Sequence, residues 1–172
     1  MKSEDLLAMH KKDVKASEMS ENKSKKDIKI LVATDGSEYA KKGLDYALSL
    51  ALMNNGEIIL LHVIPYVPES PPPLWASPKV EERDKKYVEK LYKEAEKLIE
   101  EEVNRIKNVD VKIKTVVEFG EPAEKILDVT EKLNVDLVVI GVIGKSKWKK
   151  VILGSVSDEV LDRAKVPVMI IR

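Results

Sequence analysis

The chain has 172 residues, of which 44% are apolar, and this is enough for one domain with a sizeable core. Its 30 Lys and Arg residues balance its 30 Asp and Glu residues, so the chain has no net positive charge that would attract nucleic acid or an anionic membrane. Cysteine is absent and there are two histidines, which excludes disulfides and thiol nucleophiles and argues against a multi-histidine zinc site.

Residues 1–27 are polar, with closely mixed charges, and we expect them to form a flexible extension before a domain at 28–172. The first residues lack the apolar core of a signal peptide, and no stretch is long enough to span a bilayer. We therefore expect a cytoplasmic protein whose partners include neither a membrane nor a nucleic acid.

From residue 28 onward, short apolar runs alternate with segments of helical spacing. In chain order the pattern predicts a strand at 28–33, a helix from about 38 to a stop at 54–56, a strand at 57–64, a proline-rich loop at 65–78, a helix at 79–107, a strand at 109–118, a helix from 122 to about 134, a strand at 137–140, a glycine-bounded lysine-rich loop at 141–154, a helix at 155–164 and a strand at 166–171. This alternation predicts an α/β fold, a doubly wound parallel sheet of five strands with helices on both faces.

In such sheets, ligands bind outside the carboxyl ends of the strands, where the winding reverses. The segment after the fourth predicted strand has glycines that allow close backbone approach, and Gly154-Ser155 opens a helix whose free N–H groups attract phosphate. Lys145 and the neighbouring lysines add positive charge, so the segment predicts a polyphosphate cradle. The alternative is that Gly141 only turns the chain, Ser155 only caps its helix and the lysines are solvated.

Three residues near the ends of the first two strands are further candidates. Asp35 could accept hydrogen bonds from ribose or adenine, or contact a hydrated metal; its spacing from Glu38 equally fits a helix capping box. We expect His62 to be a hydrogen-bonded structural residue rather than a catalyst, and the backbone of Val63 could face an adenine edge.

Two other phosphate-handling folds are rejected on the residues. Gly144-Lys145-Ser146 resembles the end of a P-loop, but the required glycine five residues earlier is replaced by Val139, inside the strand. A phosphoacceptor receiver domain would need an acidic pair after the first strand and an aspartate after the third. The chain has Asp35 alone and then Glu118-Phe119-Gly120 at these places.

These segments together resemble the universal stress protein family. Gly141-x₂-Gly144-x₉-Gly154-Ser155 is similar to the family's nucleotide-binding signature, G-x₂-G-x₉-G-[ST]. The segment Ala33-Thr34-Asp35-Gly36-Ser37 resembles the family's first loop, and Leu61-His62-Val63 resembles its second strand. The resemblance covers residues 28–172. The chain departs from many members at Ile143, where His or another polar residue is common, and from some at Ala33, where they have Pro.

The resemblance implies the strand order 3-2-1-4-5 and an ATP ligand whose phosphates are bridged by Mg²⁺ or Mn²⁺. It implies that Asp35 and the backbone of Val63 hold adenosine, and that Gly141 lies against the ribose. No residue is expected to bind the metal directly, although Asp35 could contact the metal through a water molecule. The full set of expected binding residues is Ala33, Thr34, Asp35, Val63, Ile140, Gly141, Gly144, Lys145, Gly154, Ser155, Val156 and Ser157.

For the function, we expect a regulatory module that senses or carries ATP with little turnover, because no histidine or cysteine stands beside the predicted phosphate site. We assign no catalytic residue. The alternative is a slow Mg- or Mn-dependent ATPase or phosphotransferase in which Asp35 positions water and the lysine-rich loop stabilises charge. Family members commonly dimerise through the last strand, and the apolar run at 166–171 would be an aggregation hazard unless it is paired. We therefore also expect a homodimer.

Overall fold

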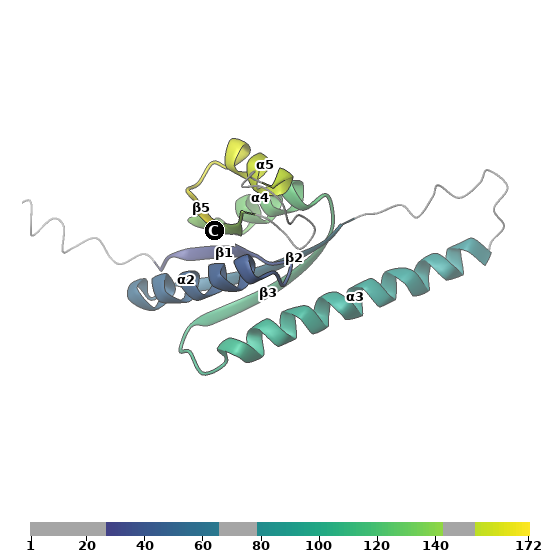
Figure 1. Ribbon diagram of the computed structural model, residues 1–172, viewed down its shortest axis with the longest axis horizontal. Coiled ribbons are helices and arrows are strands. Elements are labelled where there is room, and N and C mark those ends of the chain that lie inside the picture. The colour runs from purple at the N-terminus through teal and green to yellow at the C-terminus, as the bar shows by residue number, and fades with distance from the viewer. Residues whose placement is uncertain (1–26, 66–78, 143–153) are drawn as a thin grey trace, which may run out of the picture.

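The computed structural model of the protein describes residues 27–65, 79–142 and 154–172, with the backbone alone at 79–85. Of the predicted extension at 1–27, all but Asp27 lies outside the described residues, and so do most of the proline-rich and lysine-rich loops. The described elements form one sheet with helices packed on it (Figure 1).

The sheet has five parallel strands in the order β3-β2-β1-β4-β5, which confirms the predicted fold and strand order. At the carboxyl end of the central strand, Ala33 pairs with Leu61 on one side and with Ile140 on the other. The strands are β1 (Lys29–Ala33), β2 (Glu57–Pro65), β3 (Lys112–Gly120), β4 (Leu137–Gly141) and β5 (Val168–Ile171).

Helices cover both faces of the sheet: α2 and α3 lie on one face, and α4 and α5 lie on the other (Figure 1). Each pair closes its own apolar core, because the strands between them are buried on both faces. In the first core, the α2 side chains Leu44, Leu48 and Ala51 pack on Ile30 and Val32 of β1. The helices are α2 (Glu38–Asn54), α3 (Lys79–Ile106), α4 (Pro122–Lys132) and α5 (Ser155–Arg163).

The start of α2 differs from the capping box predicted for Asp35 and Glu38. Ser37 is the N-cap, and its side-chain oxygen accepts a hydrogen bond from the Ala40 N–H at 3.2 Å. Asp35 Oδ1 instead accepts from the Ser37 N–H at 3.0 Å. Gly36, at φ 72°, adds a turn before the helix, so the carboxylate of Asp35 shapes the loop and does not cap α2.

Two strands begin later than the apolar pattern predicts. Val109 and Val111 belong to a turn after α3 rather than to β3, and the Val109 N–H donates to the Ile106 carbonyl at 3.0 Å. Both valines pack against the α2–α3 core, so burial against a helix produced the alternation that resembles a strand. β5 begins at Val168 because Pro167 has no N–H to pair, although its carbonyl accepts from the Val138 N–H.

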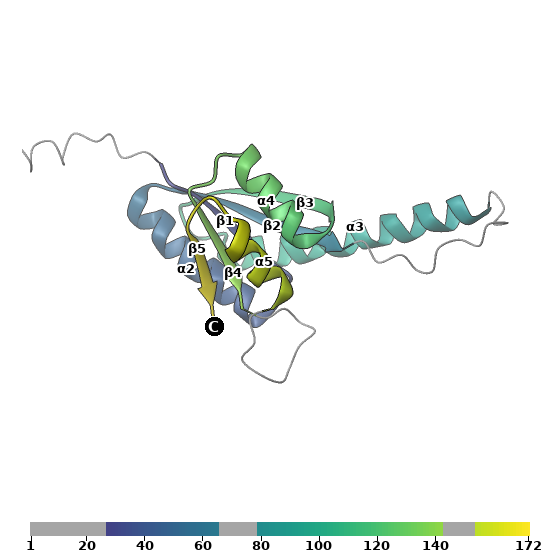
Figure 2. The same cartoon turned by 90° about the horizontal axis from the view of Figure 1, so that it is seen from above.

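The long helix α3 extends well past the sheet at its N-terminal end (Figure 2). It has 28 residues, and among those whose side chains are described, the buried ones lie in the C-terminal half: Ala95, Ile99, Glu102 and Ile106. None of the helices in the described ranges combines the length and the apolarity that a membrane span requires.

Candidate functional site

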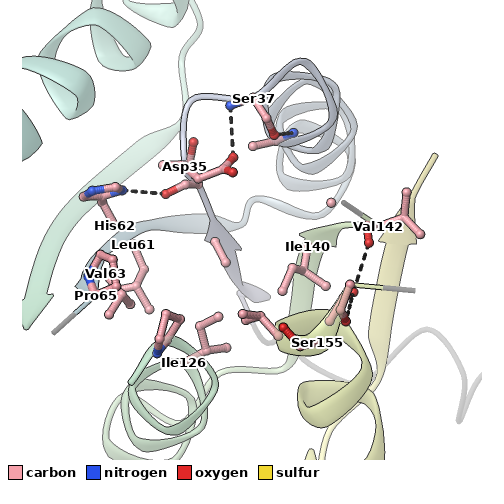
Figure 3. A pocket seen from close by; sticks show the side chains of 18 residues that line it. Asp35, Ser37, Leu61, His62, Val63, Pro65, Ile126, Ile140, Val142 and Ser155 are labelled. Atoms are coloured by element: carbon pink, nitrogen blue, oxygen red, sulfur yellow. Dashed lines mark hydrogen bonds between the residues drawn. The ribbon is translucent and has the colours of Figure 1, made fainter. Parts of the chain in front are cut away.

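A hollow of about 380 Å³ opens at the carboxyl ends of β1, β2 and β4 (Figure 3). The helix after β1 lies on one face of the sheet and the helix after β4 lies on the other, so the winding reverses between these two neighbouring strands. This is the position at which open α/β sheets bind ligands. The volume falls within the range of small-molecule pockets, roughly 300–1,000 Å³.

Ten of the twelve residues predicted to bind nucleotide line this pocket, although they come from four separate segments of the chain. The other two, Gly144 and Lys145, lie outside the described residues. The ten are Ala33, Thr34, Asp35, Val63, Ile140, Gly141, Gly154, Ser155, Val156 and Ser157.

Helix α4 supplies a wall of the pocket that the sequence analysis missed. Pro122 and Ile126, four residues apart on its first turns, line the hollow, and Figure 3 shows Ile126 across it from Asp35. The proline at the start of a helix directly after β3 was the available signal, because it places that helix at the same edge of the sheet. The other lining residues, which are not among the twelve, are Ser37, Ala40, Leu61, His62, Pro65 and Val142.

The loop between β1 and α2 is held by short hydrogen bonds. The Thr34 N–H donates to the Leu61 carbonyl at 2.8 Å, and His62 Nδ1 lies 2.7 Å from the Thr34 carbonyl oxygen. Thr34 Oγ1 also accepts from the Gly36 N–H at 3.1 Å. The loop that carries Asp35 is thus attached to β2 through both sides of Thr34, and His62 has the structural hydrogen bond expected of it.

The N-terminus of α5 forms another wall. Gly154 is the N-cap, with φ −65° and ψ 151°, and no side chain caps the helix. Ser155 is the first helical residue and is exposed, so the alternative that it only caps α5 is wrong. The first N–H groups of a helix have no acceptor within it and carry the positive end of its dipole, which suits an anion.

Ser157 lines the pocket, but its hydroxyl is directed at the chain itself. It is 2% exposed, and its Oγ lies 2.9 Å from the Gly154 carbonyl and 3.1 Å from the Val142 carbonyl. The Gly154 N–H donates to the same Val142 carbonyl at 2.8 Å. These bonds fasten the start of α5 to the end of β4 and so set the direction of its N–H groups.

Gly141 has a packing role that the sequence did not reveal. Its φ is not positive, so it does not serve as a left-handed turn. A Cβ at this position would lie 2.9 Å from the Cβ of Tyr39, on the first turn of α2. The glycine therefore lets α2 approach the end of β4 closely.

Apolar side chains from β1, β2, β4 and α4 make up most of the pocket wall: Ala33, Leu61, Val63, Ile126 and Ile140. Asp35 brings a carboxylate to their rim, and α5 brings its helix dipole. An apolar wall with a few polar groups is typical of small-molecule sites. No cluster of three or more His, Asp or Glu side chains able to hold a metal occurs within the described ranges.

Comparison with known proteins agrees with this fold. Residues 28–172 match the family model described as Universal stress protein family. The chain is similar to universal stress protein MJ0577 of Methanocaldococcus jannaschii, with 30% identity over 152 residues, covering 84% of this chain and 94% of the relative. The solved structure of hypothetical protein MJ0577 superposes with a TM-score of 0.70 at 33% identity, covering 83% and 94% of the two chains. A universal stress protein from Archaeoglobus fulgidus, solved in complex with dAMP, shares the fold with a TM-score of 0.62 at 20% identity, covering 84% and 98%.

Proposed function

Because the chain belongs to the universal stress protein family, we propose that its switch-point pocket binds an adenine nucleotide, with ATP as the preferred ligand. The observation that carries the proposal is the meeting of an apolar wall and an uncapped helix N-terminus in one hollow. A nucleotide has the same division, with a flat apolar base at one end and phosphates at the other. The dAMP complex of the Archaeoglobus fulgidus protein is consistent with such a ligand.

The pocket divides into a nucleoside half and a phosphate half. In the nucleoside half, β1, β2 and α4 would enclose the base, with Asp35 and the Val63 backbone offering polar groups to adenosine. In the phosphate half, the N–H groups of Ser155 and Val156 would face the phosphates. Mg²⁺ or Mn²⁺ would bridge the phosphates, with Asp35 reaching the metal through water.

We further propose a regulatory role with little turnover. Among the described lining residues, Asp35 and His62 are the available bases. One oxygen of Asp35 accepts from the Ser37 N–H, and His62 Nδ1 bonds the Thr34 carbonyl, so both have structural duties. The alternative, a slow ATPase or phosphotransferase, assigns water positioning to Asp35. Equal phosphate release by the wild type and Asp35→Asn, which keeps the acceptor to Ser37, would favour the regulatory role.

Isothermal titration with adenosine, AMP and ATP, comparing Gly154→Ala with Gly154→Val, tests the phosphate half. The backbone at Gly154 has φ and ψ that any residue adopts, and Ala and Val are similarly poor N-caps, so both variants should fold alike. The bulkier Val side chain should block the phosphates and lower the affinity for ATP at least about tenfold, roughly 1.4 kcal/mol. The affinity for adenosine should not change. Undiminished ATP affinity in a folded Gly154→Val protein would contradict the proposal, as would a wild type that binds none of the three ligands.

We also propose a cytoplasmic homodimer paired through β5. The half-buried residues Val168, Met169 and Ile170 leave an edge strand without charge, whereas the opposite edge, β3, exposes Lys112 and Lys114. Lysines on an edge strand block unwanted pairing, and an apolar edge invites it. Sedimentation velocity should show a dimer that Ile170→Lys dissociates and that Thr115→Lys, on the β3 edge, leaves intact. A monomeric wild type would end this part of the proposal.

A further inference from the structure

The peptide of Thr34 is held to β2 on both sides. Thr34 is 6% exposed, and it stands where β1 leaves the sheet. Its N–H donates to the Leu61 carbonyl at 2.8 Å, while its own carbonyl lies 2.7 Å from His62 Nδ1. A carbonyl only accepts hydrogen bonds, so the ring must carry a proton on Nδ1. His62 is therefore fixed in one tautomer, with Nε2 as the acceptor nitrogen of the neutral ring.

This carbonyl needs a side-chain donor for a topological reason. The β1–β2 ladder ends at the pair Ala33 and Leu61, and the chain turns away at Asp35, so the regular strand pairing does not extend to the carbonyl of Thr34. Burial of the residue limits the access of water, and a buried carbonyl without a donor is costly. His62, one residue beyond Leu61 on β2, supplies the donor.

We propose that His62 is a positioning residue for the nucleoside half of the pocket, an inference that rests on the proposed function. By fixing the Thr34 peptide, His62 fixes the point from which Asp35 departs. Within that loop, the Ser37 N–H donates to Asp35, the Gly36 N–H donates to Thr34 Oγ1, and Gly36 has a positive φ. The His62 bond is a side-chain link between the start of this loop and β2, where Val63 also lines the pocket.

The tautomer can be measured without any ligand. The chain has two histidines, His10 and His62, so His10→Gln leaves a single imidazole in the 172-residue chain. Long-range nitrogen–proton correlation spectra of this variant should show a protonated Nδ1 and a pyridine-like Nε2 at a pH where the ring is neutral. A neutral ring protonated on Nε2 would place two acceptors against each other at 2.7 Å and would overturn the inference.

Paired substitutions then test the consequence for binding. Asparagine places its amide nitrogen close to the position of Nδ1, whereas glutamine extends it toward that of Nε2. His62→Gln should lower the affinities for adenosine, AMP and ATP by the same factor, about 5- to 10-fold. The affinities of His62→Asn should stay within about twofold of those of the wild type. An equal loss for all three ligands distinguishes this effect from that of Gly154→Val, which acts only where phosphates are present.

The outcomes separate the inference from the function on which it rests. If the wild type binds none of the three ligands, the proposed function fails and the inference falls with it. Suppose instead that the wild type binds these ligands. The inference alone is then overturned if His62→Gln has the same affinity as the wild type, or if His62→Asn has an affinity as low as that of His62→Gln. Amide hydrogen exchange supplies a control without ligand, because protection at residues 34–37 should fall in His62→Gln and persist in His62→Asn.

Discussion

Replacing Gly141 with alanine separates two reasons for a glycine at the end of β4: approach of a ligand and packing of α2. The added Cβ would lie 2.9 Å from the Cβ of Tyr39. Because this Cβ is attached directly to the backbone of α2, the helix itself must move, by about 0.5 Å, to reach ordinary contact. Overpacking of this kind costs about 1–3 kcal/mol, and each kcal/mol lowers the Tm of a domain of this size by about 2–4 °C.

Thermal unfolding followed by circular dichroism, in the absence of nucleotide, measures this cost. Tyr39→Gly removes the Cβ that would collide, whereas Tyr39→Ala keeps it and serves as the matched control. We expect Gly141→Ala to cost about 1 kcal/mol less in the Tyr39→Gly background, and the same as in wild type in the Tyr39→Ala background. A Gly141→Ala protein with an unchanged Tm would refute the packing argument and leave ligand approach as the reason for the glycine.

Three further changes test other contacts. Ser157→Ala removes the hydroxyl that joins α5 to the end of β4; urea unfolding should show a loss of about 1 kcal/mol and titration a lower ATP affinity, both restored by Ser157→Thr. Arg163 lowers the pKa of Glu124 by a hydrogen bond, so this pair's contribution to stability is complete above the ordinary value of 4.5 and is lost as the pH falls through the lower folded value. Glu124→Gln should therefore lose less stability than wild type as the pH is lowered below 4.5. Arg105→Leu leaves the carboxylate of Glu102, 5% exposed, without its guanidinium partner and should cost about 2–3 kcal/mol in urea unfolding, part of which Glu102→Gln recovers in the same background.

The sheet was predictable from the sequence because its strands are buried on both faces and so appear as nearly continuous apolar runs. The errors in the predicted strand boundaries arose where a residue is buried but its backbone is not paired with a neighbouring strand. Val109 and Val111 pack against the core that α2 and α3 cover, yet their N–H groups bond within a turn. The sequence pattern indicates whether a residue is buried, but it says little about which group its backbone hydrogen-bonds.

The candidate site was predictable where local chemistry determines it. Glycines at the end of β4 and at the start of α5 are visible in the sequence, and topology alone brings them to the position of Asp35. Pro122 and Ile126 were missed because they reach the pocket through the packing of α4 on the sheet, a contact between distant segments. The capping box failed because Ser37, two residues after Asp35, competes for the same helix start.

Separate hydrogen-bond systems hold the two halves of the pocket. Thr34 is fixed by β2, whereas the start of α5 is fixed by the carbonyl of Val142, through Gly154 and Ser157. β1 and β4 lie side by side, so these two systems face each other across the switch point. A ligand that spans the hollow would contact the segments that both systems hold. A change in one system should therefore alter the affinity for one part of the nucleotide, and comparing adenosine, AMP and ATP can locate which half has been disturbed.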